Sequence, residues 1–138
     1  MKIIGYALVL ITLAASCKTQ NSDEKISDVL TGTYQVSMLN GEDVLSKGLT
    51  VILDYSTKKI SGNSGCNSYF GNFELSENRI TFKNIGKTKM YCIEKEKNEI
   101  EQKFISILSH VFEITSKTDK LELLGNDENK SKIILSKS

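Results

Sequence analysis

The chain of 138 residues contains no proline, no tryptophan, one histidine and three cysteines. A single histidine excludes any Ser-His-Asp triad that is not built around His110, and three cysteines with one histidine are too few for a zinc ribbon. Arg79 is the only arginine, and the 18 basic side chains are balanced by 17 acidic ones. A near-neutral chain with so little arginine lacks the electrostatic footprint of a nucleic-acid-binding protein. We therefore expect no nucleic-acid partner, no metal and no cofactor.

The composition is that of a small globular domain with few groups suited to catalysis. Hydrophobic residues make up 39% of the chain and charged residues 25%, which predicts one ordered domain. His110 lies near the end of a predicted helix, where its simplest role is to donate to the last helix carbonyls. Asp54 and Glu74 lie in or beside predicted strands, and nothing in their spacing indicates a glycosidase pair. The sequence therefore predicts a protein that is not an enzyme.

The first sixteen residues have the pattern of an export signal. Lys2 precedes an apolar run from Ile3 to Ala15, and small residues lead directly to Cys17. Thirteen residues are too few to span a bilayer, which needs about 20. The small residues before Cys17 resemble the lipobox of bacterial lipoproteins, in which the cysteine carries diacylglycerol and becomes the N-terminus, although Ala14 stands where leucine is usual. We predict a lipoprotein signal peptide over residues 1–16; ordinary cleaved secretion and an uncleaved anchor are the alternatives.

A lipidated Cys17 would fix the protein to a membrane of the bacterial cell envelope, with its domain facing the periplasm or the exterior. One acyl chain binds only marginally, whereas several chains such as palmitate hold stably. The residues from 18 to 28 are polar except for Ile26, so that residues 17–29 are predicted to be the lipidated cysteine and a flexible tether. A short extra helix is the alternative for this segment. The folded domain is expected over residues 30–138.

Most of the remaining chain alternates between polar and apolar residues, which is the pattern of half-buried strands. Turn residues such as glycine, asparagine and aspartate separate the alternating segments. The predicted strand segments are 32–38, 49–53, 60–62, 69–75, 80–82, 112–114, 121–123 and 133–135. Short connections between successive segments favour an antiparallel sheet.

One segment near residue 100 has the period of a helix. Its apolar stripe consists of Ile100, Phe104, Ile107, Leu108 and Val111, and its opposite, solvated face is expected to carry Glu94, Lys95, Glu101, Gln102 and Ser109. One helix cannot cover a flat sheet of this size, so the sheet should curl around it as an open or closed barrel. The predicted fold is α+β: a strongly curved antiparallel sheet or open barrel of seven to eight short strands, with one amphipathic helix on its concave face. Phe104 is expected to contact Tyr69, Phe73 and Phe82.

The centre of the chain is rich in glycine and contains the two remaining cysteines. Gly62, Gly65 and Gly71 predict a bulge, a bend or a close backbone approach, in which Asn67 would hydrogen-bond to backbone groups. With Cys17 assigned to lipid, Cys66 and Cys92 form an even pair in an exported chain. A disulfide between them would close a loop of about 27 residues and contribute roughly 3–4 kcal/mol. Two neighbouring buried thiols are the alternative.

These residues also carry a resemblance to a known family. The motif residues are Ser61, Gly62, Gly65, Cys66, Asn67, Tyr69 and Gly71, followed by Thr88, Met90 and Cys92. Together they resemble the META domain, the HslJ-like family of small bacterial envelope proteins. Three positions depart from the family pattern: Tyr34 replaces tryptophan, Ser68 replaces a basic residue, and Lys89 replaces arginine, whose planar fork lysine cannot reproduce. The resemblance implies a fold and an envelope location, in a family whose members are often lipoproteins and in some cases linked to heat or envelope stress.

The resemblance implies no catalytic activity. The sequence therefore predicts a monomeric, membrane-anchored lipoprotein that binds an unknown envelope protein or acts in envelope stress. A carrier of a small apolar ligand, enclosed by the curled sheet, is the alternative. A barrel filled by side chains would favour partner binding, and an apolar cavity of several hundred Å³ would favour the carrier.

Overall fold

A computed structural model describes residues 22–138 of the protein. The predicted signal peptide and Cys17 lie outside these residues. The strands are β1 (Gly32–Leu39), β2 (Glu42–Asp43), β3 (Thr50–Asp54), β4 (Lys59–Asn63), β5 (Ser68–Ser76), β6 (Arg79–Lys87), β7 (Val111–Lys117), β8 (Lys120–Gly125) and β9 (Lys132–Lys137). The helices are α1 (Ser22–Val29) and α2 (Lys95–Leu108), with a 3₁₀ turn over Leu45–Lys47.

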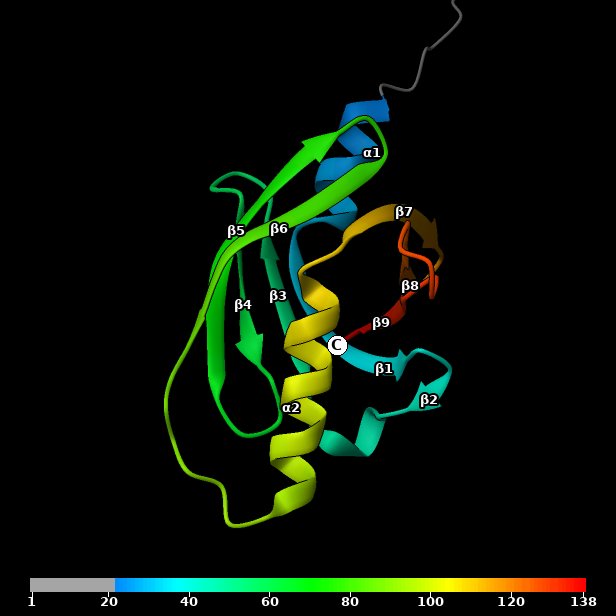
Figure 1. The fold of residues 1–138 in the computed structure, drawn as a ribbon. Coiled ribbons are helices and arrows are strands. Elements are labelled where there is room, and N and C mark those ends of the chain that lie inside the picture. Colours follow the sequence, from blue (N-terminus) through cyan, green and yellow to red (C-terminus); the bar gives the residue numbers. More distant parts are fainter. Residues whose placement is uncertain (1–21) are drawn as a thin grey trace, which may run out of the picture.

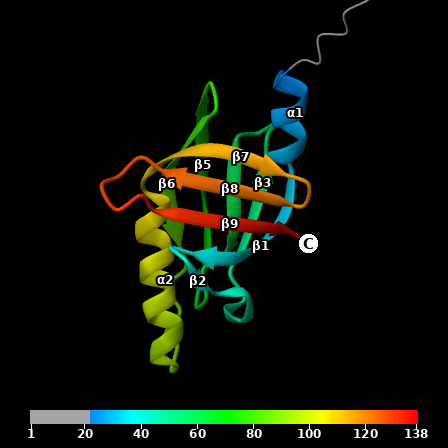
Figure 2. The ribbon, with the colours of Figure 1, turned by 90° about the vertical axis from the view of Figure 1, so that its right-hand side faces the viewer.

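The sheet is a barrel closed by pairing between its first and last long strands. Neighbouring strands are antiparallel in the order β1-β3-β4-β5-β6-β7-β8-β9, and β9 pairs back with β1. Figures 1 and 2 show the strands wrapped around a common interior. The predicted α+β fold of a strongly curved sheet with one packed helix is confirmed, and the barrel is closed rather than open. The two-residue strand β2 pairs with the end of β1 outside this ring, in a segment that the sequence predicts as a turn.

Helix α2 covers the opening between β6 and β7. These strands pair only where Arg79–Thr81 meets Val111–Glu113, and α2 connects them in the chain (Figure 1). The apolar stripe of α2 is buried, as expected, in the barrel core. The helix ends at Leu108, so Val111, which the periodicity places in the stripe, instead begins β7.

The core beneath α2 is a series of aromatic rings. Phe104 meets Tyr69 edge-on with ring centroids 5.5 Å apart. Phe73 and Phe82 are 6.5 Å apart, and Phe82 and Phe112 are 6.0 Å apart. Because each ring is at most 4% exposed, these five side chains fill the space between the helix and the strands. The predicted contact of Phe104 with Tyr69 is confirmed, whereas Phe73 packs against Phe82, and Phe82 against Phe112.

Residues 22–29, which are expected to belong to a flexible tether, instead form helix α1. Ile26 and Val29 pack against the core, and Leu30 is fully buried. The Tyr34 hydroxyl donates to the Val29 carbonyl at 2.6 Å, fixing the end of the helix to β1. The spacing of Ile26, Val29 and Leu30 at i, i+3 and i+4 is that of one helix face, although the surrounding polar composition resembles disorder. The short extra helix was therefore the better of the two interpretations for residues 22–29.

Candidate functional site

The chain bends sharply between β4 and β5, where the first half of the motif lies. The Ser64 amide donates to the Asn67 carbonyl at 2.8 Å, and Gly65 takes a φ of +110°, which side-chain-bearing residues rarely adopt. A Cβ atom at Gly62 would collide with the Thr50 carbonyl oxygen. The predicted bend with close backbone approach is confirmed, and glycine is required at these two positions for different reasons.

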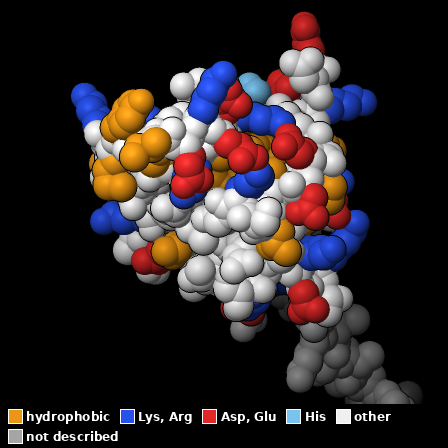
Figure 3. Space-filling view, turned by 90° about the horizontal axis from the view of Figure 1, so that it is seen from below, with side chains coloured by type: hydrophobic (Ala, Val, Ile, Leu, Met, Phe, Trp, Pro, Cys, Tyr) orange, Lys and Arg blue, Asp and Glu red, His pale blue; other side chains and the backbone are white. Residues whose placement is uncertain are grey.

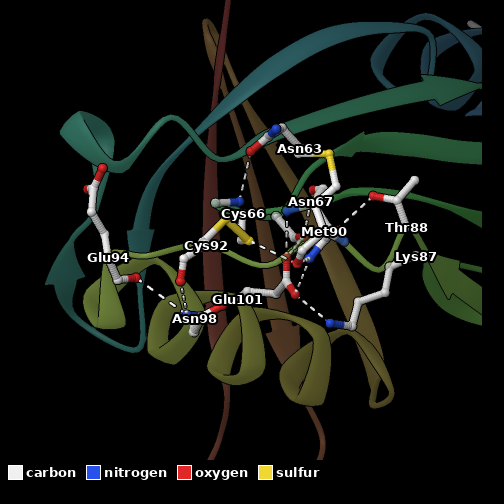
Figure 4. Close-up of polar contacts among 12 residues, drawn as sticks. Asn63, Cys66, Asn67, Lys87, Thr88, Met90, Cys92, Glu94, Asn98 and Glu101 are labelled. Carbon is white, nitrogen blue, oxygen red and sulfur yellow. Dashed lines mark hydrogen bonds and ion pairs between the residues drawn. A yellow bond between two sulfur atoms is a disulfide. The ribbon is translucent and has the colours of Figure 1, made fainter.

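Asn67 joins this bend to the loop between β6 and α2. Its side-chain oxygen accepts hydrogen bonds from the Met90 amide at 2.7 Å and the Thr88 hydroxyl at 2.8 Å. Its side-chain nitrogen donates to Glu101 of α2 at 3.0 Å. Figure 4 shows Asn67 at the centre of these contacts. The Asn67 side chain does bond to a backbone group, but that group belongs to Met90 in the loop after β6 and not to the bend itself. One side-chain amide thereby links the two halves of the motif.

A disulfide attaches the same loop to the bend a second time. Cys66 and Cys92 are bonded, with their Cα atoms 5.9 Å apart (Figure 4). Just beyond the loop, the Asn98 side chain of α2 donates to the Cys92 carbonyl at 2.8 Å. The segment of residues 88–94 is therefore held from the β4–β5 bend on one side and from α2 on the other.

Glu101 is the main residue that the sequence analysis misplaced. It is expected on the solvated helix face but is only 2% exposed. One carboxylate oxygen accepts hydrogen bonds from the Ser64 hydroxyl at 2.6 Å and from the backbone amide of Asn67 at 2.7 Å. The other accepts from the Asn67 side chain and forms an ion pair with Lys87. Both oxygens are therefore bound, and the carboxylate connects α2 to the bend and to β6.

The hydrogen bonds keep Glu101 ionised. Burial by itself raises the pKa of this carboxyl, but the bonds from Lys87, Ser64 and Asn67 outweigh burial and lower the pKa to about 2. The helical periodicity does contain a signal that Glu101 is buried. Glu101 lies three residues before Phe104 and seven before Leu108, at the edge of the buried stripe. Its polar partners, however, are separated from it in sequence by 14 residues or more.

The loop of residues 88–94, here called the apolar loop, presents its large apolar side chains to solvent. Met90, Tyr91 and Ile93 are 63%, 89% and 91% exposed. A shallow hollow of about 360 Å³ separates the loop from α2, and it is lined by Met90 and Tyr91 as well as by polar side chains such as Lys89 and Gln102. Figure 3 shows hydrophobic side chains gathered at one side of this end of the molecule, with lysines beside them.

The other sequence candidates do not form a common site. Asp54 accepts hydrogen bonds from Ser56 and Thr57 in its own turn, which lower its pKa to about 2, and Glu74 pairs with Lys83 at 2.6 Å. At His110 the backbone amide, not the predicted imidazole, donates to a helix carbonyl. Its Nδ1 atom has no hydrogen-bond partner among the described residues. Within residues 22–138 no group of three potential ligands could hold a metal ion.

Comparison with known proteins gives a family and a fold. The model of the META domain family matches residues 27–138. An NMR structure of a protein from Burkholderia xenovorans is 22% identical, with a TM-score of 0.65, and the match covers 83% of this chain and 87% of that one. A crystal structure of a DUF4847 family protein from Bacteroides vulgatus is 16% identical, with a TM-score of 0.55, covering 83% and 96%. At these identities the structures show a shared fold only. No curated protein matches the chain.

Proposed function

Since the chain belongs to the META domain family, we propose that it is a non-catalytic protein of the bacterial cell envelope, held on a membrane through lipid on Cys17, and that it acts by binding another envelope protein. The observation that carries the proposal is the contrast between a filled barrel interior and the exposed apolar loop. No helix among the described residues is long and apolar enough to cross a membrane. The proposed attachment rests on the residues before Cys17 that resemble a lipobox.

The packing of the barrel supports partner binding over ligand carrying. The five core rings lie within 5.5–6.5 Å of their neighbours, in the space that an enclosed ligand would need. The hollow beside the apolar loop is open to the surface and lies between that loop and α2, not in the barrel interior. A carrier of apolar ligands would instead need an apolar cavity.

The electrostatics of Glu101 and its hydrogen-bond partners support a structural role for this residue over a catalytic one. A general acid or base needs a pKa near the working pH, whereas the pKa of Glu101 is about 2. Within residues 22–138 its carboxylate accepts hydrogen bonds from Ser64 and Asn67 and holds the bend in place. Glu101 therefore fixes the fold around the apolar loop and is poorly suited to moving a proton at neutral pH.

Lipid attachment is tested by replacing Cys17 with serine. Serine has no thiol to form the thioether, so the variant should leave the membrane fraction for the soluble exported fraction or remain unprocessed. Radiolabelled palmitate supplied to the cells should mark the wild-type protein only. Equal labelling of the two proteins would show that the lipobox interpretation is wrong.

Partner binding is tested by chemical crosslinking in intact membranes, followed by native mass spectrometry of the extracted protein. We expect discrete crosslinked species that contain a second, different protein. The uncrosslinked protein should have the mass of the polypeptide with its lipid anchor. A stoichiometric apolar ligand in place of a protein partner would contradict the proposal and favour a carrier.

A further inference from the structure

We propose that the apolar loop is the docking surface for the partner, and that it receives an apolar protein surface bordered by carboxylates. The inference rests on the proposed function and names the site and the partner chemistry. Tyrosine and methionine are enriched at the centres of protein interfaces, and Tyr91 and Met90 are here exposed together with Ile93 on one short loop.

The loop is fixed before any partner binds. Asn67 bonds to the Met90 amide and the Thr88 hydroxyl, the disulfide holds Cys92, and the Asn98 side chain bonds to the Cys92 carbonyl. Ordering a mobile loop on binding costs free energy, and a loop already held in place avoids that cost. The buried motif therefore serves to present the exposed side chains in one arrangement.

The loop and the start of α2 carry charges of both signs, but among the described residues the unpaired charge beside the apolar side chains is positive. Glu94 of the loop pairs with Lys97 at 3.0 Å, and Glu96 pairs with Lys47. Lys89 lies directly before Met90 and has no ion pair within residues 22–138, whereas Lys87 is paired with Glu101. Lys95, at the start of α2, is 90% exposed at its side chain and only loosely paired with Glu99 at 3.4 Å. A partner with carboxylates around an apolar patch would complement these ammonium groups and be steered toward the loop.

The position of the proposed anchor favours a protein partner over the anchoring membrane. Ser22 follows Cys17 by five positions, and at about 3.5 Å per position the two residues lie at most about 18 Å apart. Helix α1 lies at the upper end of the molecule, and the apolar loop runs along its lower half (Figure 1). With α1 kept near the lipid, the loop would face away from that bilayer.

Site-specific photocrosslinking of the full chain in its native membranes tests the proposal. A photoreactive phenylalanine derivative replaces Tyr91 in one variant and Glu128, in the exposed β8–β9 turn, in a control. We expect roughly tenfold more protein adduct from position 91, with the label on a partner peptide in which an apolar residue is flanked by carboxylates. Lys89→Glu should lower that yield severalfold and Lys89→Arg should preserve it, while Lys120→Glu, at another exposed lysine, should leave it unchanged.

Several results would overturn the proposal. Adducts from position 91 that contain lipid or a second copy of this chain would show a different occupant, and an unchanged yield with Lys89→Glu would exclude the acidic border. Protein adducts from position 128 alone would place the docking surface elsewhere while leaving partner binding intact. Absence of protein adducts at both positions, together with none in the chemical crosslinking experiment, would contradict the proposed function itself.

Discussion

Replacing Glu101 with alanine is expected to lower the free energy of unfolding by about 2–6 kcal/mol, because two buried donors lose their acceptor at a cost of about 1–3 kcal/mol each. The substitution leaves the Ser64 hydroxyl and the Asn67 amide without their acceptor. It also leaves the Lys87 ammonium without its counter-ion. Because Asn67 holds the apolar loop through Met90, the loop should lose order as well. Urea denaturation of the oxidised protein measures the loss.

Glu99 provides a matched control on the same helix. Its side chain is 64% exposed and pairs with Lys95 at 3.4 Å, so that Glu99→Ala should change the free energy of unfolding by about 0.5 kcal/mol or less. Similar denaturation midpoints for the Glu99 and Glu101 variants would contradict the buried network. That outcome would restore the sequence-based expectation that Glu101 lies on a solvated face.

The pH dependence of stability provides a second measurement of the same network. An ordinary glutamate has a pKa of 4.5, and that of Glu101 in the folded protein is about 2. The unfolded chain therefore binds this proton first as the pH falls, and the stabilisation is fully present above pH 4.5 and is lost between about 4.5 and 2. The difference corresponds to about 3 kcal/mol at roughly 1.4 kcal/mol per pKa unit. Glu101→Gln should flatten this part of the profile, and an unchanged slope would exclude the depressed pKa.

The barrel could be predicted because its strands obey a local rule. Residues 32–36 of β1 and Ser68–Ser76 alternate between core and solvent, and this period of two is visible in any short window of sequence. Closure between β1 and β9 joins residues about 100 positions apart, and no local pattern encodes that pairing. The sequence therefore predicts a curved sheet, whereas the closed ring depends on long-range pairing.

The sequence predicts part of the candidate site. The part that it does not predict depends, like barrel closure, on contacts between residues far apart in the chain. Gly65 and Asn67 indicate a bend through their own conformational and hydrogen-bonding preferences. Glu101 has no comparable local signature. The cost of burying its carboxylate is offset by hydrogen bonds from Ser64 and Asn67, which lie in a turn far away in the sequence. Helix α1 is predicted only as the alternative to a tether, for a different reason: its apolar contacts, Ile26 and Val29, lie among polar residues that resemble a tether. Both errors arise where tertiary contacts outweigh composition.

Replacing Phe104 with alanine should cost about 3–5 kcal/mol, the usual loss for a buried phenylalanine. The side chain is fully buried and its ring packs edge-on against Tyr69. Truncation removes the transfer free energy of the ring and leaves a cavity that the strands of a closed barrel cannot easily fill. Since small domains are stable by only about 5–15 kcal/mol, the loss is a large fraction of the total. Denaturant unfolding followed by circular dichroism measures it.

Phe70 provides the aromatic control for this experiment. It lies on the outer face of β5 and is 59% exposed, so that Phe70→Ala should cost about 1 kcal/mol or less. A difference of several kcal/mol between the two variants would place the helix stripe inside the barrel, where α2 covers the gap between β6 and β7. Equal costs would mean that α2 is not docked through Phe104. The helix would then be unable to hold Glu101 and Asn98 in the positions that fix the apolar loop.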